Sequence, residues 1–499
     1  MRIAAGIVLA FSLIAVARSQ TGPVSNGLSE YEDANFKVAL PLLRAAAAAD
    51  PKNASVRAAL LSSLTYEGLV DEAADAFDAA ATDFPNSPEV LTARGEFTYY
   101  MGDVYLANQL FNRSVKIAET ARAVFALSEM LRASSNYRTA RLLTMRAHEL
   151  DPKDALITRA WIPSLIPEKR REVFGPFRAA HPWLYEHYAT QSATSSQVAA
   201  GVNKRKAFEL DGGLQETTLH LVPLMYTATK IRGLGLEFTI ENGKRLVLLF
   251  DTGASGIMVN QKAVDKVGLS HLGTIEGRGI GDKGPRNGFV SVADTCKIST
   301  LTYKTCVMRV FEGKHPAGDE DGLIGADFFS RYVVQIDFQR RLLHLTPQPA
   351  REPSAQGYNR APLPDEKDFT PIFRYGHQLM VPTRLNGKTW GLFLIDTGSS
   401  MSIVDSTFAR LSTKVYANSY MRVRGLSGEV NKVFEADRAQ LEFATFRQQN
   451  VGITSVNLNN SPEHVPVRMS GVFGFPLLDL FRLTIDYRNG LVKFDYVKK

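Results

Sequence analysis

The second half of the chain carries one ordered set of landmarks twice. In each copy an Asn-Gly-Lys triplet precedes an apolar run that ends in Asp-Thr-Gly, at Asp251 in the first copy and at Asp396 in the second. Two apolar residues and a glycine follow downstream, and this glycine is Gly325 in the first copy and Gly474 in the second, 74 and 78 residues after the aspartate. The shared order and near-equal spacing indicate an internal duplication with units of about 140 residues.

The sequence around both copies is typical of β-structure, with short runs of strand formers such as 246–250. Five prolines fall between 347 and 364, and proline is disfavoured inside helices and central strands. We therefore expect a first β unit, a linker and a second β unit, at 216–346, 347–366 and 367–499.

An apolar strand that ends in Asp-Thr-Gly, with an apolar-apolar-Gly segment downstream, resembles one lobe of the aspartic proteases. The duplication resembles the two-lobed, single-chain form of that family, and each unit is closer in size to a retropepsin subunit than to a pepsin lobe. The resemblance covers 216–499. It implies a bilobal, all-β acid-protease fold that hydrolyses peptide bonds.

The resemblance places Asp251 and Asp396 side by side as a catalytic pair. Two adjacent carboxylates cannot both ionise easily, so they share one proton. The ionised carboxylate then activates a water, and the protonated one polarises the scissile carbonyl. The expected activity is that of an aspartic-type endopeptidase that acts on a peptide or protein and needs no metal or other cofactor.

The residues after each aspartate are expected to support the pair. The resemblance implies that the two threonines interlock across the interface, and each glycine lets the backbone turn sharply after the aspartate. The support positions are Thr252, Gly253, Thr397, Gly398 and Ser399.

The two copies differ three positions after the aspartate. Ser399 has a hydroxyl that, in the family, can donate to the neighbouring carboxylate, whereas Ala254 has none. A hydrogen bond to the charged form lowers a pKa. We therefore expect this pair to titrate higher than in strongly acid-adapted relatives, with an activity optimum in the mildly acidic range.

Two glycine-rich segments between the landmarks are candidates for mobile flaps over the substrate. The segment at 276–281 and the segment at 424–428 contain glycines that permit a hairpin tip. Ordinary glycine-rich turns are the alternative, and neither segment has the tyrosine that pepsin-like flaps carry. The candidate flap glycines are Gly279, Gly281, Gly425 and Gly428.

The first third of the chain is predicted to be helical. Alanine and leucine recur there at spacings of three and four, and turn signals recur at a period of 34, with Gly68 and Gly102 one period apart. This pattern resembles tetratricopeptide repeats over 30–160. The repeats either bind a peptide or protein partner or form a spacer packed on the protease. Residues 161–215 are expected to be a transition in which prolines such as Pro176 break helices. The whole chain is thus expected to be a multidomain α + β protein, with a helical solenoid before the β lobes.

The N-terminus predicts export. Arg2 precedes an apolar run at 3–16, and Ala15-Val16-Ala17 has the form of a signal-peptidase site. A run of this length is short for a membrane span. We expect a signal peptide at 1–17, cleavage after Ala17, and a periplasmic or extracellular protein without a stable membrane span.

Other residues suggest few further sites. Cys296 and Cys306 flank a β-like turn and are either bridged or free thiols. The net charge of +7 is scattered, so we expect no nucleic-acid partner. The histidines are dispersed and are interpreted as ordinary surface or core residues, without a metal site: His220, His271, His315, His344, His377 and His464.

Two functions other than proteolysis stay open. The lobes could form a cleft that binds peptides without catalysis, or the repeats could recruit partners as a scaffold. The intact Asp251 and Asp396 argue against the first alternative, because a binding protein need not retain two buried carboxylates. Capture of a partner by residues 20–160 would support the second.

Overall fold

The computed structural model describes most of the chain. The expected signal peptide, part of the expected transition at 161–215 and the triplet Asn242-Gly243-Lys244 lie outside the described residues. The described ranges are 23–188, 206–240, 245–269, 271–311, 320–351, 357–460 and 465–497.

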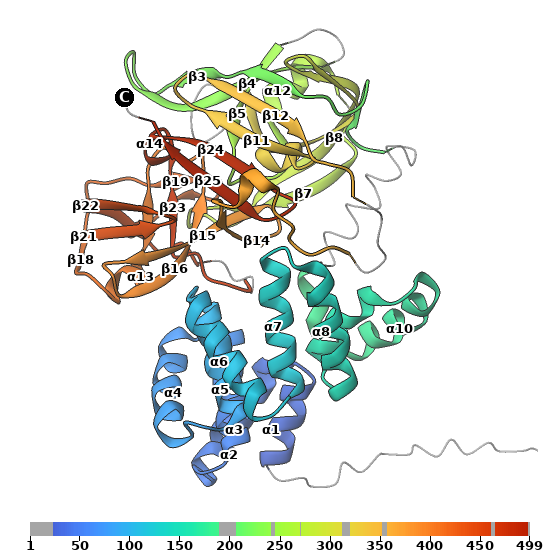
Figure 1. The fold of residues 1–499 in the computed structure, drawn as a ribbon, viewed down its shortest axis with the longest axis vertical. Coiled ribbons are helices and arrows are strands. Elements are labelled where there is room, and N and C mark those ends of the chain that lie inside the picture. The colour runs from blue at the N-terminus through green and yellow to red at the C-terminus, as the bar shows by residue number, and fades with distance from the viewer. Residues whose placement is uncertain are drawn as a thin grey trace, which may run out of the picture.

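The N-terminal region consists of paired helices stacked along one side of the molecule (Figure 1). The two helices of a pair are antiparallel, and the first helix of one pair also packs on that of the next. The pairs are α1 (Pro23–Glu32) with α2 (Phe36–Ala49), α3 (Ala54–Tyr66) with α4 (Val70–Asp83), α5 (Pro88–Tyr100) with α6 (Val104–Ile117), and α7 (Ala121–Ala133) with α8 (Tyr137–Leu150).

The turn inside each pair contains a residue with positive φ. Gly68 and Gly102, which carry the period in the sequence, have φ values of 70° and 92°. Ala34 and Ser135 occupy the corresponding turns of the first and last pairs, with φ values of 53° and 63°. A side chain is tolerated there at some cost in strain. The period therefore extends one pair further in each direction than the glycines indicate.

The turn between successive pairs ends in a helix cap. The side chains of Asn53, Ser87, Thr120 and Asp154 each accept a hydrogen bond from a backbone N–H three residues later. Such caps accept hydrogen bonds from backbone N–H groups of the first helical turn, which have no partner inside the helix. They explain why a polar residue stands at each of these four positions.

The helical region extends beyond 160. Helix α9 (Ala155–Trp161), α10 (Pro167–Ala180) and the 3-10 helix η2 (Pro182–Tyr188) follow α8. The expectation that Pro176 breaks a helix is wrong, because it lies inside α10. No residue of α10 is buried, so the kink that proline causes can be accommodated at the surface.

The first β unit, which we name lobe 1, is a sheet that closes on itself. Its strands lie in the order β1-β9-β6-β10-β5-β4-β8-β7, β3 pairs with β4, and a β8–β9 pairing closes the sheet. The bounds are β1 (Glu209–Leu210), β3 (Val222–Met225), β4 (Ile231–Ile240), β5 (Arg245–Asp251), β6 (Ile257–Asn260), β7 (Gly273–Gly277), β8 (Arg286–Ile298), β9 (Leu301–Phe311) and β10 (Gly322–Gly325), with helix α12 (Gln261–Val267) after β6.

The second unit, lobe 2, repeats this plan. Its order is β14-β15-β16-β23-β17-β22-β21-β18, closed by a β15–β21 pairing. The bounds are β14 (Phe373–Tyr375), β15 (Gln378–Leu385), β16 (Thr389–Ile395), β17 (Ile403–Asp405), β18 (Val415–Ala417), β21 (Val433–Phe443), β22 (Phe446–Val456) and β23 (Gly471–Phe473), with the hairpin β19 (Arg424–Gly425) and β20 (Gly428–Glu429) and the helices α13 (Ser406–Arg410) and α14 (Phe475–Leu478).

A third sheet joins the two lobes. Strand β11 of the first unit pairs antiparallel with β24 of the second, with Val334 opposite Ile485. Both residues are fully buried and belong to one apolar cluster that also includes core residues of both lobes. The sheet order is β13 (Thr370–Pro371), β25 (Leu491–Tyr496), β24 (Phe481–Asp486), β11 (Tyr332–Asp337), β12 (Leu342–Pro347) and β2 (Thr217–His220).

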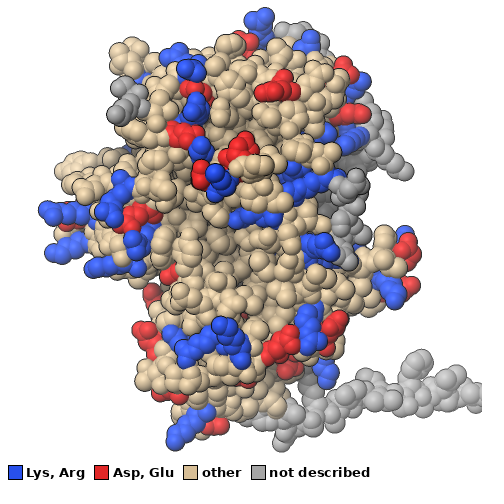
Figure 2. All heavy atoms as spheres, viewed as in Figure 1, with Lys and Arg blue, Asp and Glu red and all other residues tan. Residues whose placement is uncertain are grey.

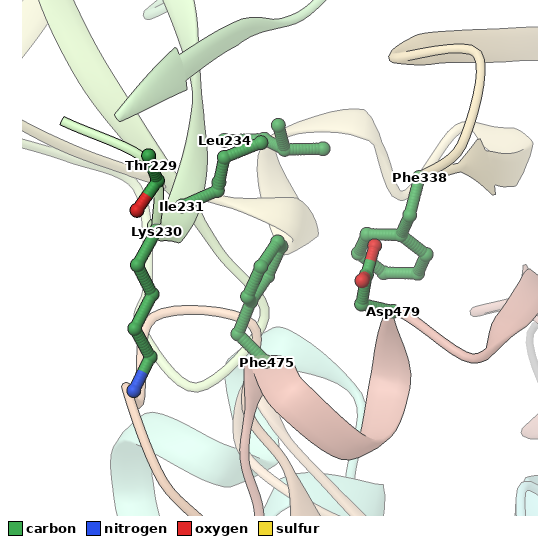
Figure 3. Close-up of a pocket in the computed structure, with 7 residues that line it drawn as sticks. All are labelled: Thr229, Lys230, Ile231, Leu234, Phe338, Phe475 and Asp479. Carbon is green, nitrogen blue, oxygen red and sulfur yellow. The ribbon is translucent and has the colours of Figure 1, made fainter. Parts of the chain in front are cut away.

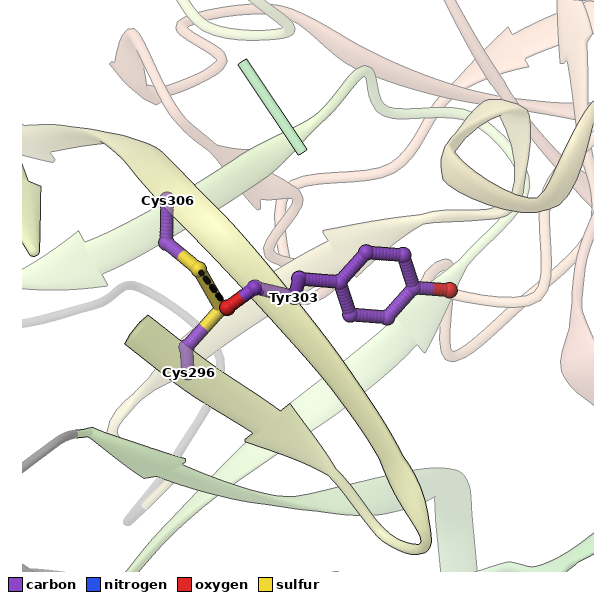
Figure 4. The surroundings of a disulfide bond; sticks show 3 residues. All are labelled: Cys296, Tyr303 and Cys306. Atoms are coloured by element: carbon purple, nitrogen blue, oxygen red, sulfur yellow. Dashed lines mark hydrogen bonds between the residues drawn. A yellow bond between two sulfur atoms is a disulfide. The ribbon is translucent and has the colours of Figure 1, made fainter. Parts of the chain in front are cut away.

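A disulfide fixes the β8–β9 hairpin of lobe 1. Cys296 and Cys306 are bonded, with Cα atoms 6.1 Å apart. The Cys306 sulfur lies 3.5 Å from the carbonyl oxygen of Tyr303 (Figure 4). Of the two states that the sequence left open, the structure has the bridge.

The surface has mixed charge. Lysines and arginines are interspersed with acidic residues on the face shown in Figure 2 and form no single basic field there. Among the described residues, no helix is both long enough and apolar enough to cross a membrane.

The helical region docks on lobe 2. A buried cluster contains Phe111 and Met130 from the helices together with Met380 and Leu392 from the lobe. The backbone N–H of Arg468 donates to the Tyr100 carbonyl at 2.7 Å. One side of the helical region is therefore an internal interface.

Gly102 tests this docking. A Cβ at Gly102 would lie 3.1 Å from the Leu392 nitrogen and 3.1 Å from the Ser470 hydroxyl. We expect Gly102→Ala to lower the unfolding free energy by about 2–3 kcal/mol, from strain and crowding together. The matched control is Gly68→Ala, whose Cβ would meet only the Tyr100 hydroxyl within 4 Å. Chemical unfolding should show a smaller loss for the control, and equal losses would contradict the docking account.

Candidate active site

Two threonines lock the lobes together beneath the site. The Thr252 hydroxyl donates to the Ile395 carbonyl at 2.7 Å and accepts from the Thr397 N–H at 3.0 Å. The Thr397 hydroxyl likewise donates to the Phe250 carbonyl at 2.7 Å and accepts from the Thr252 N–H at 3.0 Å. The arrangement is the reciprocal interlock that the resemblance implies. It fixes the two strand ends that carry the aspartates.

Asp251 and Asp396 face each other across this interlock. Their carboxyl groups are hydrogen-bonded to one another. A Cβ at Gly398 would lie 2.4 Å from Cγ of Asp251, and a Cβ at Gly253 would lie 2.7 Å from Cγ of Asp396. Only glycine therefore fits at each position, because a side chain there would clash with the carboxyl group of the opposite lobe. The backbone turns at both glycines as expected, with the Ala254 N–H 3.4 Å from the Asp251 carbonyl oxygen and the Ser399 N–H 3.3 Å from the Asp396 carbonyl oxygen. The opposite carboxyl group is a second reason for glycine, which the sequence does not indicate.

Strand pairing supports both aspartate loops from below. In lobe 1, β10 pairs parallel with β5 so that Gly325 lies opposite Asp251. In lobe 2, β23 pairs parallel with β16 up to Ile395 and Phe473, one residue before Asp396 and Gly474. The apolar-apolar-Gly segments thus form the strands next to the catalytic candidates.

The pKa values of both carboxyl groups are raised. Burial is the main cause for Asp251, the charge of Asp396 adds to it, and the result lies well above the ordinary aspartate value. Burial also raises the pKa of Asp396, but hydrogen bonds from Asp251 and from the backbone oppose the shift. Since the two groups share a hydrogen bond, we assign the proton to Asp251 and the charge to Asp396.

Backbone donors account for this asymmetry. The Asp396 carboxylate accepts from the N–H groups of Gly398 and Ser399, both at 2.9 Å. Asp251 accepts from Gly253 at 2.8 Å, and its bond from the Ala254 N–H is the weaker one. The Ser399 hydroxyl does not donate to the carboxylate as expected, because it donates to the Met401 carbonyl at 2.8 Å. The preference for charge on Asp396 therefore comes from the backbone.

The two candidate flap segments pair with each other. The N–H of Lys283 donates to the Ser427 carbonyl at 2.8 Å, and the N–H of Ser427 donates to the Ile280 carbonyl at 3.1 Å. A Cβ at Gly281 would lie 2.4 Å from the Ser427 carbonyl carbon, and one at Gly425 would lie 2.4 Å from the Ile280 oxygen. The loops therefore form a strap between the lobes.

The strap lies close to the Asp396 loop. Ile280 of lobe 1 packs on an apolar cluster of lobe 2 that includes Leu394 and has Met401 beside it. Asp282 fastens the same contact, because it accepts from the N–H of Asn431 at 2.7 Å. The strap therefore joins lobe 1 to the part of lobe 2 that carries Asp396.

Asp327 adjoins the site without having been predicted. It accepts from the Ser255 hydroxyl at 2.8 Å and from the Gly256 N–H at 2.9 Å. Asp327 follows Gly325 by two residues, but no pattern in the sequence indicates that its side chain reaches the loop after Asp251.

A pocket of about 310 Å³ lies between the β3–β4 hairpin and α14 (Figure 3). Its lining includes Lys230, Phe338, Phe475 and Asp479, and neither Asp251 nor Asp396 lines it. The Phe475 N–H donates to the Ser399 carbonyl at 2.8 Å, which connects the pocket wall to the loop after Asp396. Among the described residues, no group of three or more His, Cys, Asp or Glu side chains is placed to hold a metal ion.

Residues 236–328 match a family model described as aspartyl protease, and this stretch contains Asp251 and Gly325. The chain contains an aspartyl protease domain. The matched residues lie in lobe 1 and do not include Asp396. We pair Asp396 with Asp251 because of the internal duplication and because their carboxyl groups are hydrogen-bonded.

Among solved structures, the aspartic proteinase from Irpex lacteus matches with a TM-score of 0.37 and 12% sequence identity. The match covers 57% of this chain and 98% of that one. A search of curated proteins gave no match. The aspartyl protease domain is preceded by the region of paired helices.

The threonine interlock predicts a specific stability effect. Thr252→Ala leaves the Thr397 N–H and the Ile395 carbonyl without their buried partner. We expect it to lower the unfolding free energy by about 2–4 kcal/mol. Thr252→Ser keeps the hydroxyl and should cost about 1 kcal/mol. Equal losses in denaturant titrations would show that the hydroxyl does not join the lobes.

The raised pKa of Asp251 predicts a pH-dependent stability effect. Above about pH 4 the unfolded chain ionises this group while the folded chain keeps the proton, so the group lowers stability as the pH rises. Asp251→Asn should therefore have a higher melting temperature than the parent near neutral pH, and the gap should shrink as the pH falls. The exposed Asp368→Asn is the control and should show no such trend. A constant gap at every pH would contradict the shared-proton assignment.

Proposed function

We propose that this protein is an aspartic endopeptidase that hydrolyses peptide bonds with a water activated by Asp251 and Asp396. One observation carries the proposal, namely the hydrogen bond between the two carboxyl groups at the junction of two similar lobes. A protein that only bound peptides would have no use for a buried pair that is costly to ionise. The family match of residues 236–328 supports the same function.

The difference between the two carboxyl groups indicates which one is the base and which one is the acid in the first step. Asp396 accepts a proton from the water while the water oxygen attacks the carbonyl carbon, and Asp251 donates its proton to the carbonyl oxygen. The product of this step is a tetrahedral diol. Asp396, with two backbone donors, is suited to be the base, and Asp251, with the higher pKa, is suited to be the acid.

The second step returns both groups to their starting states. Asp396 passes its proton to the leaving nitrogen as the carbon–nitrogen bond breaks, and Asp251 recovers a proton from a hydroxyl of the diol. The reaction forms one carboxylic acid and one amine from a peptide and a water. The threonine interlock keeps the two carboxyl groups aligned through both steps.

We further propose that the protein is exported and acts in the periplasm or outside the cell. The apolar run at 3–16 supports this location, and so does the Cys296–Cys306 bridge, because disulfides persist in oxidising compartments. The paired helices then belong to the exported protein. Their 34-residue period supports a tetratricopeptide-like origin.

The central prediction concerns activity. The full chain should cleave an unstructured protein, and Asp251→Asn and Asp396→Asn should each lower kcat by about 10²- to 10⁴-fold. Digestion followed by mass spectrometry from about pH 3 to about pH 8 measures this. Because Asp251 has a raised pKa, the basic limb of the pH profile should extend into the mildly acidic to neutral range.

The exposed Asp368→Asn serves as the matched control and should leave kcat unchanged. Activity that survives either aspartate substitution would mean that the lobes do not share one site. An inactive parent at every pH would favour a peptide-binding function.

A further inference from the structure

The part of the strap that comes from lobe 1 carries a single apolar side chain. In the segment 276–284, Ile280 stands among glycines and charged residues, with Gly279 before it and Gly281 after it. Gly281 has a φ of 128°, a conformation that other residues rarely adopt. A glycine-rich tip of this kind can move with little resistance from its own backbone. The contacts of Ile280 therefore decide where the tip rests.

Ile280 rests on an apolar cluster of lobe 2, which we name the Asp396-side cluster. Among the described residues that form this cluster or pack against it, Ile280 alone comes from lobe 1. The buried members are Leu394, Ile403, Val423, Val433, Val456 and Val472. The tip of one lobe thus inserts an aliphatic side chain into an apolar site of the other.

The cluster lies on the side of β16 that faces the aspartate pair. Side chains alternate along a strand, and Phe393 and Ile395 belong to the main core. Leu394 therefore points to the opposite side, as does Asp396, whose N–H continues the ladder by donating to the Phe473 carbonyl at 3.0 Å. In a peptide bound at Asp396, an apolar side chain next to the scissile bond would meet Leu394 and its neighbours.

Hydrogen bonds between the lobes hold the tip in this position. The Asp282 carboxylate accepts from the Asn431 N–H at 2.7 Å and from the Asn460 side chain at 3.1 Å. The Ile280 carbonyl accepts from the Ser427 N–H at 3.1 Å. Both bonds of the Asp282 carboxylate are exposed, so water can replace them when the strap opens.

The corresponding cluster of lobe 1 receives no such side chain. Leu249 and Leu323 lie opposite each other in neighbouring strands, as two members of the Asp396-side cluster do in lobe 2. Together with Ala254 they form a small apolar cluster. The described residues that pack against it, Leu224 and Met258, both belong to lobe 1. The insertion of a strap residue is therefore one-sided, and the duplication does not explain it.

We propose that the strap is an autoinhibitory element, in which Ile280 occupies the site beside Asp396 that receives an apolar side chain of the substrate. The inference rests on the proposed peptidase function, which defines the substrate. The strap has to release Ile280 before a substrate side chain enters the site. Because a branched aliphatic residue fills the site now, substrates with such a residue next to the cleaved bond are favoured.

Peptide binding to an inactive variant tests the inference without cleavage. The protein is the full chain with Asp251→Asn, and the probe is a hexapeptide with isoleucine on both sides of its central bond. When Ile280→Ser is added, calorimetry should give a Kd at least about 5-fold lower, because a site that is mostly closed has a reduced apparent affinity. The same hexapeptide with serine in place of isoleucine should gain nothing.

Further variants in the same background separate the site from the contacts that hold the strap. Asp282→Ala keeps Ile280 but removes both side-chain bonds to lobe 2, and it should also strengthen binding of the isoleucine peptide. Ile280→Val fills the site again and should bind like the parent. Glu276→Ala changes an exposed residue of the same segment and should have no effect. Equal or weaker binding in Ile280→Ser, or no binding in any variant, would overturn the proposal.

Kinetics of the chain with both aspartates separates this proposal from the proposed function. In an active peptidase, Ile280→Ser and Asp282→Ala should raise kcat/KM for the isoleucine peptide about 5-fold, mainly through a lower KM. Stronger binding without any cleavage would support the occupied site while the peptidase function failed. Cleavage with an unchanged kcat/KM in both variants would leave the peptidase function standing and refute the autoinhibitory strap.

Discussion

The site depends on the reciprocal hydrogen bonds between Thr252 and Thr397. Each threonine uses its hydroxyl both to donate to the opposite strand and to accept from the opposite backbone. Both side chains are buried, so water cannot replace these bonds at low cost. The interlock brings two carboxyl groups into one space, and the shared proton and the raised pKa values follow from that closeness.

Much of this site could be predicted from the sequence, because the duplication repeats its landmarks at nearly constant spacing. Asp251, Asp396 and the two threonines lie where the resemblance implied. The backbone turn at Gly253 and Gly398 could be predicted, but their close approach to the carboxyl group of the opposite lobe could not, because no local pattern records the distance between the lobes.

Gly68 and Gly102 indicate the helical period in the sequence, but two further turns of the same period contain no glycine. Ala34 and Ser135 accept positive φ without being glycine, which only the backbone reveals. Pro176 was misjudged because a proline in the sequence does not by itself show where a helix ends, and α2 and α10 both continue through one, at Pro41 and Pro176. The docking of the helices on lobe 2 had no local signature, since its residues come from segments hundreds of positions apart. That docking makes one face of the helical region an internal interface with lobe 2.

The most direct test of the shared site is a crystal structure of the full chain with a peptide that carries a hydroxyl group in place of the scissile carbonyl. Such a group imitates the tetrahedral diol and binds where the water and the carbonyl oxygen react. The account predicts that the hydroxyl oxygen lies within hydrogen-bonding distance of both Asp251 and Asp396, with the peptide beneath the strap of Ile280 and Ser427. A hydroxyl bound to only one of the aspartates, or a peptide bound elsewhere, would contradict it.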